Sequence, residues 1–144
     1  MELDRQLKQK LEPIFSQYQR IIAGYLFGSY VKGPIHPKSD IDIAVLLDKK
    51  YEKNFTFDRR LDLEVTITKA LETENFDLVF LNEVPLILKF RIISCGKLVY
   101  VKDDDERCEV EEKIMREYYD FLPRLREFNK EYFDTLKERY IKND

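Results

Sequence analysis

The sequence has few of the residues that carry disulfide or histidine chemistry. Its 144 residues include two cysteines and one histidine. Two cysteines cannot form a disulfide scaffold, and Cys95 and Cys108 have neither CxxC spacing nor a histidine cluster, which excludes a structural zinc site. There is also no Ser-His-Asp set and no Walker-type lysine motif. We therefore expect two free thiols and a chemistry that depends on other residue types.

Long apolar runs and a large excess of one charge are also missing. No stretch approaches the roughly 20 apolar residues that a membrane-spanning helix needs. The charged start, MELDRQLKQKLEP, predicts no secretory signal. The 25 basic and 28 acidic residues nearly balance, whereas nucleic-acid binding leaves a strongly basic footprint. We expect one cytoplasmic domain over residues 1–144, with no membrane partner and with nucleic acid disfavoured as the main partner.

Apolar periodicity predicts alternating helices and strands. Residues 57–71 fit two patterns. Leu61, Leu63, Val65 and Ile67 alternate as in a strand, whereas the set that fits helical spacing is Phe57, Leu61, Val65, Thr68 and Leu71. We favour a helix, because a crossover is needed before the next strand. Strands are expected at 21–27, 40–47, 76–81 and 97–101, and further helices at 3–18, 85–96 and about 106–140.

These elements define the expected fold class. It is an α/β or α+β domain with a small mixed sheet of about four strands, flanked by helices. The core spans about residues 20–101, and a long C-terminal helix of about 106–140, with a possible bend at Pro123, completes the domain.

A Gly-Ser pair follows the first strand. Gly28 allows a tight turn with close backbone approach to a ligand, and Ser29 adds a hydroxyl beside amides that can bind phosphate oxygens. Lys32 lies one turn further and can meet a phosphate as a point charge, or it can be a solvated lysine. The pair predicts a phosphate-binding turn, although Gly-Ser after a strand is common.

Two aspartates begin the second strand, ten residues after Ser29. Because strand side chains alternate between faces, Asp40 and Asp42 point the same way while Ile41 and Ile43 point to the core. Two neighbouring carboxylates repel each other, and a divalent cation relieves the repulsion; Mg²⁺ typically takes one or two carboxylates and substrate phosphates. Asp-x-Asp can also be a simple turn and cap. The spacing from Gly28-Ser29 favours metal-assisted nucleotidyl transfer.

A third carboxylate would complete such a site, and Asp77 is the best candidate. It opens the apolar strand FDLVFL, and neighbouring strands lie about 4.8 Å apart, within reach of a shared metal pair. Asp77 could also take the proton of an acceptor hydroxyl as general base.

The segment LFGSYVKGPIHPKSDIDIAVLL resembles the signature of the DNA polymerase β-type nucleotidyltransferases, in particular their minimal nucleotidyltransferase (MNT) branch. The resemblance covers about residues 20–101, and GSx10DxD is its specific part. It implies a nucleotidyltransferase fold, ATP as substrate, Mg²⁺ held by Asp40 and Asp42, a matching later aspartate at Asp77, and transfer of AMP to a hydroxyl. Members often have arginine where this chain has Lys32.

The aromatic tail at 118–133 is similar to the C-terminal helix of MNT antitoxins that accompany HEPN ribonuclease toxins. The resemblance implies AMP transfer to a tyrosine of a cognate HEPN toxin. Two alternatives stay open: an antitoxin that neutralises its partner by binding alone, and transfer to a small molecule such as an aminoglycoside. The tail itself can form a partner surface, pack on its own domain or make a homodimer face.

Overall fold

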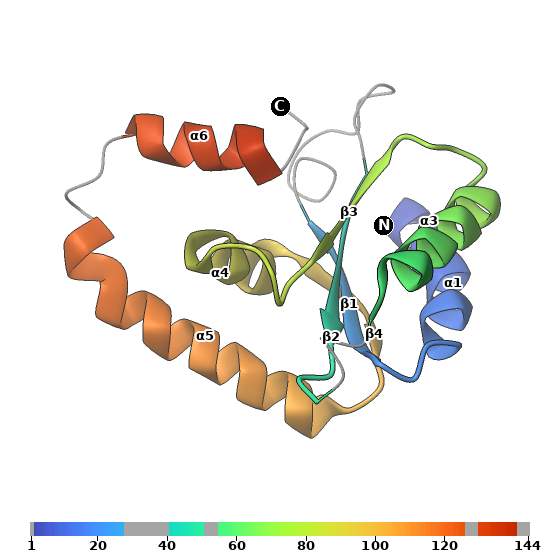
Figure 1. The fold of residues 1–144 in the computed structure, drawn as a ribbon, viewed down its shortest axis with the longest axis horizontal. Coiled ribbons are helices and arrows are strands. Elements are labelled where there is room, and N and C mark those ends of the chain that lie inside the picture. Colours follow the sequence, from blue (N-terminus) through green and yellow to red (C-terminus); the bar gives the residue numbers. More distant parts are fainter. Residues whose placement is uncertain (1, 28–40, 51–54, 126–129, 141–144) are drawn as a thin grey trace.

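The computed structural model describes residues 2–27, 41–50, 55–125 and 130–140 (Figure 1). Within them, no helix is long and apolar enough to cross a membrane. The elements, in chain order, are α1 (Glu2–Ser16), β1 (Ile21–Phe27), β2 (Ile41–Leu47), α3 (Phe57–Leu71), β3 (Phe76–Phe80), α4 (Leu86–Cys95), β4 (Lys97–Val101), α5 (Asp104–Leu125) and α6 (Lys130–Tyr140).

The four strands form one mixed sheet in the order β3-β2-β1-β4. β1 pairs antiparallel with β2 and with β4, and β2 pairs parallel with β3. The parallel pair requires a crossover, because both strands run in the same direction and a short turn cannot join them. The mixed sheet flanked by helices confirms the expected fold class.

Helices cover both faces of the sheet (Figure 1). The first core joins α1 and α3 to one face, and Phe15 of α1 and Leu63 of α3 are fully buried in it. The second core joins α4 and α5 to the other face through residues such as Leu88 and Ile114. β2 serves both cores, because alternate side chains point to opposite faces. Ile43, Val45 and Leu47 belong to the first core, and Ala44 and Leu46 belong to the second.

Residues 57–71 form a helix, as expected, and provide the crossover between β2 and β3. Thr56 caps the helix by accepting a hydrogen bond from the Arg59 amide at 3.3 Å. Leu63 and Ile67 form the buried face. The apolar stripe at helical spacing lies on the other side, where Phe57, Leu61 and Val65 are 75%, 49% and 45% exposed.

The expected helix over about 106–140 is present as two helices, α5 and α6, with residues 126–129 outside the described ranges. Pro123 lies in the last turn of α5, where its missing amide hydrogen weakens continuation of the helix. The two helices lie on either side of α4 (Figure 1), and Leu136 of α6 packs with Ile87 of α4 and Phe121 of α5. One continuous helix would carry Leu136 away from this contact, so burial of Leu136 favours two.

The aromatic tail packs in part on its own domain. Tyr118 stacks on Phe90 of α4 with a ring-centroid distance of 3.7 Å, whereas Tyr119 is 59% exposed. The side chains of residues 125–133 lie outside what the structure describes. Packing on the domain therefore accounts for Tyr118 and leaves Tyr119 at the surface.

Two leucines test the orientation of α3. Leu63→Ala should lower the free energy of unfolding by about 2–5 kcal/mol, because Leu63 is fully buried. Leu61→Ala removes the same atoms from a half-exposed position and should cost less than about 1 kcal/mol. Urea denaturation of both variants measures the difference. In a strand these two residues would share a face, so equal losses would contradict the helix.

Candidate active site

Asp42 is the one charged side chain that is buried within the described part of the chain, with an exposed fraction of 0%. It is the second residue of β2, and both of its carboxylate oxygens are buried. Its ladder partner in β1 is Phe27. Burying a carboxylate is costly unless another group or a metal ion compensates for the lost hydration. A site that recruits a cation accounts for such a position.

Asp77 is the ladder partner of Asp42 on the other side. It is the second residue of β3, and its Oδ2 atom is also buried. Paired residues of neighbouring strands share a face of the sheet, and the strands lie about 4.8 Å apart. The parallel register therefore places two carboxylates side by side on the face covered by α4 and α5. A divalent cation would relieve their repulsion, and oxygen ligands suit Mg²⁺.

The structure thus brings together two of the six residues predicted for the site, and their roles stay predictions. Gly28, Ser29, Lys32 and Asp40 lie outside the described residues. Their places in the chain are informative all the same. Gly28 follows Phe27, the ladder partner of Asp42, and Asp40 directly precedes Ile41, the first residue of β2. Within the described ranges, no group of three or more His, Cys, Asp or Glu side chains is arranged to hold a metal ion.

Tyr25 connects this face of the sheet to α5, and sequence reasoning did not find it. Its hydroxyl donates a hydrogen bond to Glu111 Oε2 at 2.7 Å, and Arg107 donates to the same oxygen at 2.8 Å. Burial and the hydrogen bond to Glu111 raise the pKa of Tyr25, so the hydroxyl stays a donor. The two partners are 86 residues apart, and no local pattern signals their pairing. The contact anchors the strand whose last residue, Phe27, lies beside Asp42.

The fold and the carboxylate pair define a class of protein: a small α+β domain with an acidic site at one end of two parallel strands. Residues 9–105 match the family model described as polymerase beta, nucleotidyltransferase. The matched range covers more than half of the chain and includes all six predicted site residues. The chain belongs to the polymerase beta nucleotidyltransferase family.

Several known proteins are similar to this chain in sequence or in structure. A relative called protein adenylyltransferase MntA, from Shewanella oneidensis, is 36% identical over 83 residues, which are 57% of this chain and 56% of that protein. The alignment thus spans little more than half of that relative. A crystal structure of a toxin–antitoxin with AMP-PNP has a TM-score of 0.65 at 27% identity and covers 81% of this chain and 90% of that one. A mutant of the MntA–HpeT toxin–antitoxin has the same TM-score and coverage at 25% identity.

The carboxylate pair predicts where a divalent cation binds. Mn²⁺, a paramagnetic substitute for Mg²⁺, should broaden the amide NMR signals of Ile43 and Leu78, which follow the two aspartates. Asp42→Asn or Asp77→Asn should weaken this effect by about tenfold or more, because each removes a charged ligand.

The matched control is Asp134→Asn, which removes an exposed carboxylate from α6 and should leave the broadening unchanged. Broadening centred instead on the acidic start of α5 would contradict the assignment of the cation to Asp42 and Asp77.

Proposed function

We propose that this protein is a Mg²⁺-dependent nucleotidyltransferase that transfers AMP from ATP to a tyrosine hydroxyl of a cognate HEPN ribonuclease toxin, and so acts as the antitoxin. The single observation that carries the proposal is the register pair of Asp42 and Asp77 inside a polymerase beta nucleotidyltransferase domain. One comparison supports ATP as the substrate, and a second supports a protein as the acceptor of AMP. One structural relative contains AMP-PNP, an analogue of ATP, and the curated relative is a protein adenylyltransferase.

Each predicted residue has a role in this proposal. Asp40, Asp42 and Asp77 hold the metal ions, and the Gly28-Ser29 turn holds the β- and γ-phosphates with help from Lys32. When bound, Mg²⁺ would neutralise charge on the triphosphate oxygens and polarise the α-phosphate of the AMP group that is transferred. The buried carboxylate pair fits this metal because hard cations prefer carboxylate oxygen.

The transfer step exchanges one phosphorus–oxygen bond for another. The acceptor hydroxyl oxygen forms a bond to the α-phosphorus of ATP, and the bond from that phosphorus to pyrophosphate breaks. The hydroxyl proton passes to the carboxylate of Asp77, which acts as general base. Asp77 is suited to this role because it lies near the start of β3, an edge strand of the sheet, beside Asp42.

A second candidate function is neutralisation by binding alone. The exposed ring of Tyr119, beside the stacked pair of Tyr118 and Phe90, favours it, because exposed aromatic side chains are typical of protein interfaces. In that case the nucleotide site would regulate binding or would have no turnover.

One substitution separates the two functions. Asp42→Asn should lower transfer of label from ATP to a co-expressed HEPN ribonuclease toxin by about 100-fold or more, since a lost metal ligand forfeits several kcal/mol of transition-state stabilisation. Asp134→Asn should keep full transfer. Autoradiography of the partner measures it, with growth of toxin-expressing cells as the second readout.

The two readouts distinguish the candidates. Loss of labelling together with loss of protection supports transfer as the antitoxin activity. Protection by Asp42→Asn without labelling would support binding alone, and undiminished labelling would exclude Asp42 from the active site.

A further inference from the structure

A groove lies at the end of β2 opposite to Asp42, away from the candidate active site. It has a volume of about 590 Å³ and is bounded by the end of β2, by α4 and by the first half of α5. Such a volume is within the usual range of small-molecule sites.

The floor of the groove is apolar and firmly held. Leu46 and Leu81 are 1% exposed, and Ile114 is 4% exposed. Asn82 is held in place by the backbone of Leu47, which donates to Asn82 Oδ1 at 2.8 Å and accepts from Asn82 Nδ2 at 3.1 Å. The floor therefore has a defined shape. Because these side chains are already almost fully buried, the apolar surface open to a ligand includes Val110, which lines the groove and is partly exposed.

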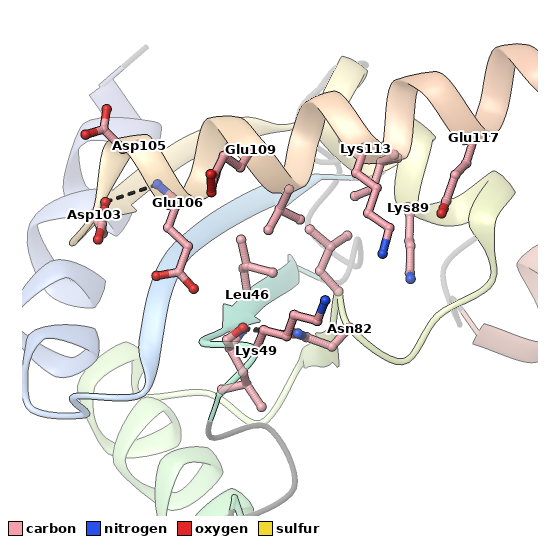
Figure 2. A pocket seen from close by; sticks show the side chains of 14 residues that line it. Leu46, Lys49, Asn82, Lys89, Asp103, Asp105, Glu106, Glu109, Lys113 and Glu117 are labelled. Atoms are coloured by element: carbon pink, nitrogen blue, oxygen red, sulfur yellow. Dashed lines mark hydrogen bonds between the residues drawn. The ribbon is translucent and has the colours of Figure 1, made fainter.

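Charge is divided between the two ends of the groove. Figure 2 shows the carboxylates of Asp103, Asp105, Glu106 and Glu109 toward the start of α5, and the ammonium groups of Lys49, Lys89 and Lys113 toward α4. The acidic end has a structural reason, because Asp103 Oδ1 accepts the Glu106 amide at 3.1 Å and acidic groups are favourable in the first turn of a helix.

Helix capping explains the acidic end of the groove but not the lysines at its other end. The three lysines come from three separate segments, the turn after β2, α4 and α5, and none of them forms an ion pair with another described residue. Like charges that converge without a partner repel each other, and an anion relieves the repulsion. Glu117 lies at this end as well and offsets one of the three positive charges, so the remaining charge suits one anionic head group.

We propose that this groove binds a small amphipathic organic anion, whose phosphate or carboxylate head lies among Lys49, Lys89 and Lys113 and whose apolar or aromatic body packs against Val110 above the buried floor. Lysines bind such heads as point charges, and the acidic end orients the ligand by repelling its head. The site is separate from the predicted triphosphate site, since the two lie at opposite ends of β2.

NMR titration of the isotope-labelled full chain tests the proposal with four probes. AMP carries a phosphate head and an aromatic body, and octanoate carries a carboxylate head and an apolar body. Adenosine lacks the head, and inorganic phosphate lacks the body. AMP, octanoate or both should shift the amide signals of Val110 and Ile114, and binding should be at least about tenfold tighter than that of the matching fragment.

Substitutions of the lysines test whether the probe binds in this groove. Lys89→Gln and Lys113→Gln should each weaken binding of the active probe by about fivefold to tenfold, since each removes one charged contact. Lys69→Gln, on the exposed side of α3 across the sheet, should bind as the wild type does.

The same spectra report whether each variant is folded. The proposal is overturned if neither AMP nor octanoate shifts Val110 and Ile114, or if both groove variants bind as tightly as the wild type. Shifts of Ile43 and Leu78 alone would assign the nucleotide to the candidate active site and would also overturn it.

Discussion

The parallel pairing of β2 with β3 is the constraint on which the candidate active site depends. The register that pairs Asp42 with Asp77 also pairs Ile43 with Leu78, whose side chains point into the core under α1 and α3. A slip by one residue would turn one set of side chains to the opposite face, so that a carboxylate would enter an aliphatic core. The same apolar alternation that stabilises the sheet therefore holds the two carboxylates together.

On one face of the sheet, the start of β2 lies at the carboxylate pair and its end lies at the groove. At its start, the buried carboxylates of Asp42 and the adjacent Asp77 favour a divalent cation. At its end, Leu46 forms the floor of a groove with lysines on one side, and α4 and α5 supply the walls. The hydrogen bond from Tyr25 to Glu111 fixes α5 against β1 on this same face. The position of α5 thus affects both the groove, which it lines, and β1, the strand that directly precedes Gly28.

Local patterns predicted much of the fold. The strands at 21–27 and 97–101 have the predicted bounds, because each is a short apolar run that ends at a glycine or a charged residue. The helix at 57–71 was chosen on topology, since its apolar residues fitted two periods, and its exposed stripe shows why periodicity was ambiguous there. The long C-terminal helix, expected over about 106–140 with a possible bend at Pro123, is present as α5 followed by a second helix, α6, and only contacts with α4 decide that Leu136 packs back onto the domain.

By itself, the sequence determined which segments are helices and strands and which residue types follow each strand, since periodicity, turn residues and the spacing of Gly28-Ser29 from Asp40 and Asp42 are local properties. It also singled out Asp77, but by order along the chain alone. The tertiary structure decided that Asp77 lies beside Asp42, that Tyr25 reaches Glu111, and that three lysines from separate segments line one groove. These pairings depend on strand register and helix packing, which many distant contacts set together and no short segment encodes.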